Sequence, residues 1–174
     1  MNNPNDFHFT PTSISTSLVN VPFFEDATAD YAPYYTSRNH GVTEEKAKSQ
    51  VLTELAKLGA GSILFEDGYF GTGDQKRYGY RLRFMYGGAH GMIRVAGLPI
   101  KNEHTNKKIE AIKVQALLNV RDWLKSTVTS MVFAPNTDIL ISHLLVSPDS
   151  DITIADHIRS QGNIPQLTSG AKNE

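Results

Sequence analysis

The stretch "KRYGYRLRFMYGGAHGMIRVAG", residues 76–97, decides the fold. Aromatic and apolar residues occupy the even positions from 78 to 86, whereas three arginines occupy odd positions before the turn. A period of two residues indicates a β-strand with one apolar face and one basic face. Gly87 and Gly88 follow, and two glycines are typical of a two-residue hairpin turn. The stretch therefore predicts an antiparallel β-hairpin.

A two-residue turn also determines which residues face each other across the hairpin. Counting back from the two glycines places Leu82 opposite Ile93 and Arg81 opposite Arg94. A shift of one residue would set apolar side chains against basic ones along the whole ladder, so we expect this register. Like charges directly opposite each other destabilise a sheet unless an anion or an acidic partner lies between them. The arginine pair therefore requires such a partner.

Helices are expected on both sides of the hairpin. Upstream, a helix over about 43–58 begins at the N-cap residue Thr43, and a strand over 62–70 follows it. Downstream, Pro99 ends the third strand, and a long helix spans about 106–130. Short helices follow in "DILISHLLV", where a strand is the alternative, and in "TIADHIRSQGN".

These elements predict an α+β fold, a three-stranded antiparallel β-meander flanked by helices in the order α-β-β-β-α-α-α. An extended N-terminal arm, residues 1–42, precedes a single domain at 43–167 and a flexible tail at 168–174. We expect the arm to hold one short strand at most and to be anchored by buried Val19, Val21, Phe23 and Phe24. The two main helices would cover the apolar face of the meander. The long helix would do so with the stripe Ile109, Ile112, Ala116, Val120 and Trp123.

The composition bounds the class of protein. The chain has 174 residues, 40% of them hydrophobic and 20% charged, which is typical of a globular domain. It has no cysteine, which excludes disulfides, thiolate metal sites and cysteine nucleophiles. No apolar run approaches the roughly 20 residues of a membrane span, and the N-terminus lacks the pattern of a signal peptide. We therefore expect a cytoplasmic protein without membrane contact.

Positive charge gathers in one part of the chain. Residues 71–108 carry a net charge of +6, although the whole chain carries −1. Such asymmetry indicates an anion-binding surface, and arginine suits phosphates because its donors fork in a plane. The alternative is an ordinary solvated face. The candidate nucleic-acid-binding residues are Arg77, Arg81, Arg83, Arg94, Lys107 and Lys108.

Catalytic and metal sites receive little support. The segment "GYFGTGDQK" has the glycine spacing of a phosphate-binding loop, but it lacks the lysine and hydroxyl that should follow the second glycine. His90 and His104 could meet near the sheet, yet no histidine pair has the spacing of a helical metal site. Glu66, Asp67 and His90 could form an acid–base group of an unrecognised hydrolase. We predict no cofactor, no metal and no catalytic residue.

Several motifs give the chain a resemblance to known proteins. They are "ELAKLGAGSILFE", "YGYRLRFMYGG", "MIRVAGLPI", "KVQALLNVRDWL", "HLLVSPDSDITIADHI" and "NIPQL". In this order they resemble a family of small uncharacterised proteins encoded by phages, prophages and other mobile elements. The resemblance implies a mobile-element context and no activity. The order of helix, three strands and helix is also similar to phage-type single-strand annealing proteins, by analogy of topology alone.

Two functions follow as expectations. The first is a non-enzymatic accessory protein of a phage or mobile element that binds single- or double-stranded nucleic acid through the basic sheet face. The second is a protein-interaction module, a regulator or inhibitor that engages an acidic protein partner. Assembly into a homo-oligomer stays open. Against the first, the tyrosines of the hairpin point to the face opposite the arginines, whereas a single-strand platform interleaves aromatic rings with positive charge.

Overall fold

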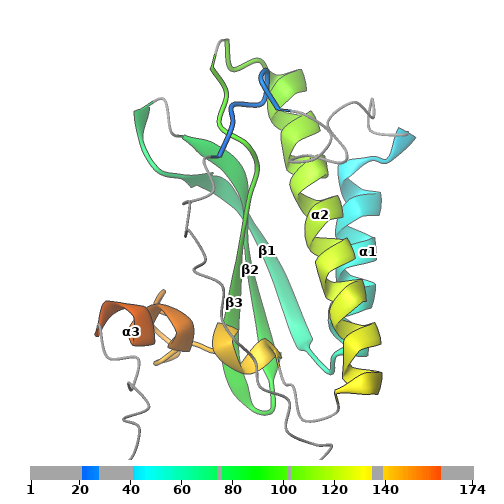
Figure 1. The fold of residues 1–174 in the computed structure, drawn as a ribbon, viewed down its shortest axis with the longest axis vertical. Helices are drawn as coiled ribbons and strands as arrows, with labels where there is room; N and C mark the ends of the chain where they lie inside the picture. The colour runs from blue at the N-terminus through cyan, green and yellow to red at the C-terminus, as the bar shows by residue number, and fades with distance from the viewer. Residues whose placement is uncertain (1–20, 28–40, 74–75, 102, 135–138, 162–174) are drawn as a thin grey trace, which may run out of the picture.

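The structure is a computed structural model that describes residues 21–27, 41–73, 76–101, 103–134 and 139–161. Its elements are α1 (Glu44–Lys57), β1 (Gly61–Phe70), β2 (Arg77–Tyr86), β3 (Ala89–Ala96), α2 (Asn106–Phe133), η3 (Ile139–His143) and α3 (Ile154–Ser160). The predicted α+β class and element order are confirmed, with the 3-10 helix η3 in the place of the third helix (Figure 1).

The first helix begins where its capping residue predicts. Thr43 Oγ1 accepts a hydrogen bond from the backbone N–H of Lys46 at 3.3 Å, and Glu44 lies in the first turn. The cap satisfies one of the donors that a helix start leaves unpaired, and a first-turn carboxylate suits the helix dipole. Gly59 follows the helix with a φ of +88°, a conformation that favours glycine.

The hairpin has the predicted register. β2 and β3 pair antiparallel, with Leu82 opposite Ile93 and Arg81 opposite Arg94. Both glycines of the turn have positive φ angles, +55° and +81°, as a tight hairpin turn needs. β1 pairs with the other side of β2, so the sheet order is β1-β2-β3 and β1 is an edge strand.

Helices α1 and α2 run side by side over one face of the sheet, where the core lies (Figure 1). Tyr80, Leu82 and Phe84 of β2 are buried under them. Because α2 contacts α1 as well as β2 and β3, its residues 112–118 are buried nearly all the way round the helix. The sequence pattern also places Trp123 in the core, but this was wrong, since its side chain is 37% exposed.

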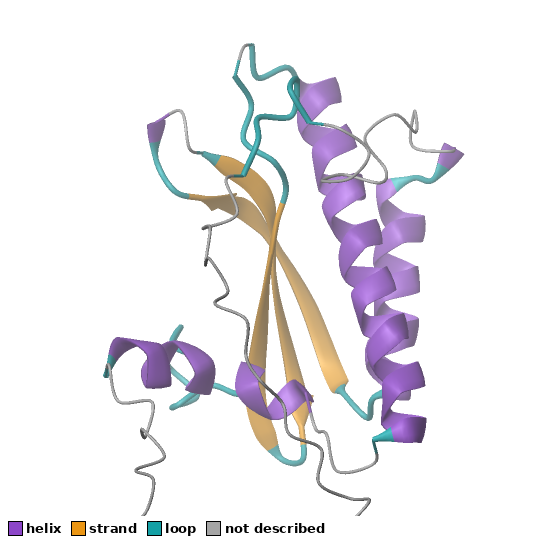
Figure 2. Ribbon diagram, in the orientation of Figure 1, coloured by secondary structure: helices purple, strands orange, loops and turns teal. Residues whose placement is uncertain are grey.

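The segment from 139 to 161 attaches to β3 (Figure 2), and His143 of η3 also packs against Trp123 of α2. Leu144 forms an antiparallel bridge with Gly91 of β3, and Leu145 forms a second bridge with Thr153. Within "DILISHLLV", the described residues 139–146 therefore contain the short helix η3 and two isolated β-bridges, but no strand. Thr153 then caps α3, where its side chain accepts a hydrogen bond from the backbone of Asp156.

The structure describes two pieces of the expected N-terminal arm, residues 21–27 and 41–42. The backbone N–H of Phe24 donates to the carbonyl of Pro99 at 2.8 Å. Val21 is 39% exposed rather than buried, and residues 21–27 form a turn and no strand. The other arm residues and the expected tail lie outside the described residues. Within the described ranges, no helix has the length and hydropathy to cross a membrane.

Candidate functional site

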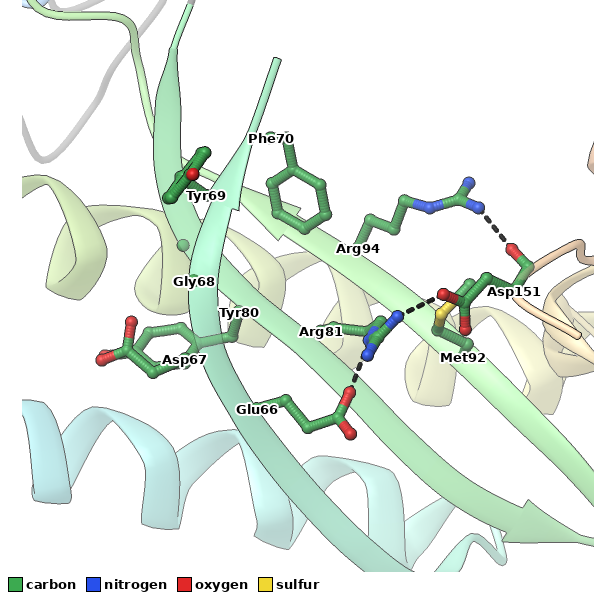
Figure 3. Close-up of a pocket in the computed structure, with 11 residues that line it drawn as sticks. Glu66, Asp67, Gly68, Tyr69, Phe70, Tyr80, Arg81, Met92, Arg94 and Asp151 are labelled. Carbon is green, nitrogen blue, oxygen red and sulfur yellow. Dashed lines mark hydrogen bonds and ion pairs between the residues drawn. The ribbon is translucent and has the colours of Figure 1, made fainter. Parts of the chain in front are cut away.

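The basic face of the hairpin holds three arginines that share acidic partners; we call Arg81, Arg83 and Arg94 the arginine cluster. Arg81 Nε donates to Glu66 at 2.5 Å, and its Nη1 donates to Asp151, as Figure 3 shows. Arg83 Nη2 donates to the same Asp151 carboxylate at 2.5 Å. Glu66 comes from β1, whereas Asp151 comes from the turn before α3. Two distant parts of the chain thus meet at these guanidinium groups.

The opposed pair Arg81–Arg94 has the acidic partner that its like charges require. Arg94 Nη1 donates to Asp156 at 2.8 Å, and its Nη2 donates to the backbone carbonyl of Asp151 at 2.6 Å. The three arginines of the cluster are therefore matched by three carboxylates, of which Asp156 also pairs with Arg159. An anion that binds here must compete with carboxylates of this chain.

The ion pairs keep two of these carboxylates charged at neutral pH. Partial burial alone would raise the pKa of Glu66, but the hydrogen bonds and charges of Arg81 and Arg83 hold that pKa below its ordinary 4.5. The hydrogen bond from Arg94 lowers the pKa of Asp156 below its ordinary 3.8. Hydrogen bonding and opposite charge both favour the ionised form of a carboxyl group.

A hollow of about 400 Å³ opens beside the arginine cluster (Figure 3). Gly68 of β1 and Gly79 of β2 lie opposite each other and line it without side chains. We call this space the glycine hollow. Its further lining includes Glu66, Phe70, Arg81, Met92, Arg94 and Asp151. An aromatic ring, guanidinium groups and carboxylates thus surround a flat strip of backbone.

An exposed tyrosine, a half-buried tyrosine, a histidine and a lysine lie together where β1 ends and β2 begins. The Tyr69 side chain is 61% exposed, and Lys76 Nζ lies 3.8 Å from the centroid of its ring. Tyr78 packs against Tyr69 with ring centroids 6.4 Å apart, and its hydroxyl shares a hydrogen bond of 3.1 Å with Nδ1 of His104. We call these four residues the aromatic–lysine cluster.

The sequence predictions missed the aromatic–lysine cluster. Its signal lies in the pairing of β1 with β2, because Tyr69 stands directly opposite Tyr78. That register cannot be counted from a two-residue turn, because the six residues 71–76 separate Phe70 from Arg77.

The six predicted binding residues separate into groups. Arg81, Arg83 and Arg94 come together, but Arg77 turns to the backbone and donates to the carbonyl of Gly97 at 2.7 Å. Burial lowers the pKa of Arg77. Lys108 Nζ bonds to Glu25 at 3.1 Å, whereas Lys107 is exposed and forms no ion pair with a described residue. Both lysines lie in the first turn of α2.

The predicted acid–base group does not assemble. Asp67 accepts from Lys113 Nζ at 2.6 Å in a pair between β1 and α2, while Glu66 binds the arginine cluster. His90 lies beside the hairpin turn, and His104 lies near the far end of the hairpin, against Tyr78. Among the residues that the structure describes, no three His, Asp or Glu side chains are placed to hold a metal ion.

Comparison of the chain with protein-family models, with curated protein sequences and with solved structures finds no match. The resemblance to mobile-element proteins therefore stays a prediction.

Proposed function

We propose that this protein binds single-stranded nucleic acid without catalysing a reaction, as a non-enzymatic accessory protein. The observation that carries the proposal is the aromatic–lysine cluster, in which Lys76 lies 3.8 Å from the ring centroid of exposed Tyr69. Single-strand binding proteins stack bases on such rings and neutralise phosphates with neighbouring cations. The objection that aromatic rings and positive charge lie on opposite faces does not apply to this cluster.

The position of Tyr69 makes its ring accessible to a base. It lies in β1, the edge strand, near the end of that strand. A base that stacks on Tyr69 would place its neighbouring phosphates beside Lys76. Every base has a π-face, so recognition of this kind tolerates many sequences.

The start of α2 offers a second contact for phosphates. Its first turn contains Lys107 and no acidic residue, although a positive charge at a helix N-terminus is unfavourable. A phosphate bound beside Lys107 would relieve this repulsion. His104 precedes the helix and contacts Tyr78, so the helix start adjoins the aromatic–lysine cluster. A strand that leaves Tyr69 in this direction would meet positive charge.

The arginine cluster supports the proposal in a weaker way. Its guanidinium groups suit phosphates, but Asp151 and Glu66 already occupy them. A phosphate must displace the Asp151 carboxylate to bind there, so we expect modest affinity at this face. The mobile-element context rests on the sequence resemblance alone.

The test is a fluorescence-anisotropy titration of a labelled single strand of about 15 nucleotides. We expect the dissociation constant to rise with salt and the duplex of the same sequence to bind more weakly. Tyr69→Ala should weaken binding about 5- to 150-fold, the value of one stacked base. Lys76→Gln should lower the slope of log affinity against log salt by about 0.7. Lys125→Gln, the same change at an exposed α2 lysine outside the cluster, is the matched control.

The second candidate is an acidic protein partner, which one observation favours. Arg81 and Arg83 both bind the single carboxylate of Asp151, so this pair suits an aspartate or glutamate side chain. Affinity capture that returns one acidic protein in stoichiometric amount after nuclease treatment would support this candidate. Loss of that protein with Arg83→Ala, and no effect of Tyr69→Ala, would place it on the arginine cluster.

A further inference from the structure

The glycine hollow contains a glycine that the described packing of the protein does not require. A Cβ at Gly79 would lie 1.9 Å from the carbonyl oxygen of Val95, so this position needs glycine. A Cβ at Gly68 would have no atom within 4 Å, and its φ angle is not one that favours glycine. Glycine inside a strand weakens it and often marks a place where a ligand approaches the backbone. The open space above Gly68 is therefore a candidate site.

The walls of the hollow define the chemistry of its ligand. Phe70 lies two residues after Gly68 and so projects from the same face of β1; Figure 3 shows its ring next to the Arg94 side chain. Arg81 and Glu66 close the other side. Glu66 Oε2 binds the arginines, while its Oε1 accepts no hydrogen bond from a described residue. A flat aromatic ligand with donors and acceptors on its edge fits these groups.

We propose that the glycine hollow binds one unstacked nucleobase of a single strand. The base lies on the backbone at Gly68 and stacks on Phe70. Its edge accepts hydrogen bonds from Arg94 or Arg81 and donates one to Glu66. This inference rests on the proposed function and adds to it a base-binding pocket, distinct from the exposed ring of Tyr69.

The location of the hollow is compatible with one continuous strand. Tyr69 stands between Gly68 and Phe70 in the sequence and belongs to the opposite face of β1. Because β1 is an edge strand, a nucleic-acid strand can pass around it from one face to the other. One base then stacks on Tyr69 and a neighbouring base enters the hollow.

The decisive variant is Gly68→Leu in the full chain, because its side chain fills the hollow without a clash at the Cβ. Gly61→Leu is the matched control, since a Cβ at this other glycine of β1 also meets open space and lies outside the hollow. Thermal unfolding followed by circular dichroism checks that both variants fold. If Gly68→Leu does not fold, Gly68→Ala takes its place.

Each protein is titrated with a set of single strands that carry one abasic site at successive positions. For the wild type, abasic sites at two positions should weaken binding about 5- to 150-fold each. In Gly68→Leu, an abasic site at one of these positions should no longer weaken binding, and the intact strand should bind correspondingly more weakly than it binds the wild type. In Gly61→Leu both penalties should persist.

Three other results would overturn the inference, and they distinguish a wrong base pocket from a wrong proposed function. If the wild type binds strands with salt-dependent affinity but Gly68→Leu keeps both penalties, the base pocket is wrong and the proposed function stands. If the wild type binds no strand, both are wrong. If Gly68→Leu instead abolishes binding of an acidic peptide, the hollow serves a protein partner.

Discussion

Replacing Asp151 with asparagine should strengthen the binding of a single strand, because Asp151 competes with phosphate for the arginine cluster. Its carboxylate accepts hydrogen bonds from Arg81 and Arg83. The asparagine keeps the size of the side chain and removes its charge. The backbone carbonyl at this position, which accepts from Arg94, is unchanged.

The expected size of the effect follows from these contacts. The Asp151 side chain is 54% exposed, so its two ion pairs are partly screened by water. Exposed ion pairs contribute about 0.2–1 kcal/mol each, and two of them together give about 1 kcal/mol. The wild type loses this free energy when phosphate displaces Asp151, whereas Asp151→Asn does not. Affinity should therefore rise about fivefold.

The same contacts predict two further readouts for Asp151→Asn. The free energy of unfolding in urea should fall by about 1 kcal/mol, since the two ion pairs of the folded state are lost. The slope of log affinity against log salt should steepen by about 0.7 for each arginine that gains a phosphate. Stability and nucleic-acid affinity should thus change in opposite directions.

Asp149→Asn is the control for net charge. Asp149 lies in the same turn, is exposed and forms no ion pair with a described residue. We expect this variant to keep the wild-type stability and an affinity within about twofold of the wild type. Equal gains in affinity for both variants would refute the competition at the arginine cluster and leave only a long-range charge effect. An unchanged affinity for Asp151→Asn would also refute it.

Three further predictions concern stability. Gly79→Ala should destabilise the protein by about 1–3 kcal/mol in urea unfolding, because its Cβ would clash with the Val95 carbonyl; wild-type stability would contradict this. Asp67→Asn should lower the free energy of unfolding by about 1–2 kcal/mol, because it leaves the buried Lys113 ammonium without its charged partner. Lys113→Met should lower it by less, and a larger loss for Lys113→Met than for Asp67→Asn would contradict this. The pKa of Glu66 is lowered in the folded protein, so its contribution is present above pH 4.5 and lost as the pH falls further. The stability difference between wild type and Glu66→Gln should therefore narrow below pH 4.5, and a constant difference would contradict the pKa shift.

The hairpin was predictable from the sequence because its two-residue period and its two-glycine turn together determine one register. The alternation along β2 shows which residues share a face of the sheet, and the position of the two glycines determines the register of β2 against β3. The pairing of Arg81 with Arg94 follows from these two observations. The same argument predicted that this pair needs an anion or an acidic partner. The identity of the partner was not predictable, since Asp151 lies 70 residues beyond Arg81 and the fold alone brings them together.

Tertiary packing decided the features that the pattern missed. Lys113 lies off the predicted apolar stripe of the long helix, yet it is buried because α2 packs against α1 and the sheet at once. Trp123 lies on the stripe, but at this level of α2 the buried side chain is that of Leu124, and the Trp123 ring packs on His143 with centroids 5.5 Å apart. The helical period places residues on a face, but it does not say which residues of that face the neighbouring elements cover.

The most direct test of the central claim, that a single strand binds at the far end of the sheet from the hairpin turn, is an NMR titration of backbone amides with an unlabelled oligonucleotide at low salt. We expect shifts concentrated at residues 66–70 and 76–81 and at the start of α2, around Lys107. The shifts should vanish as salt is raised from about 50 to 200 mM. Unperturbed amides at low salt, or shifts centred on α1, would contradict the account.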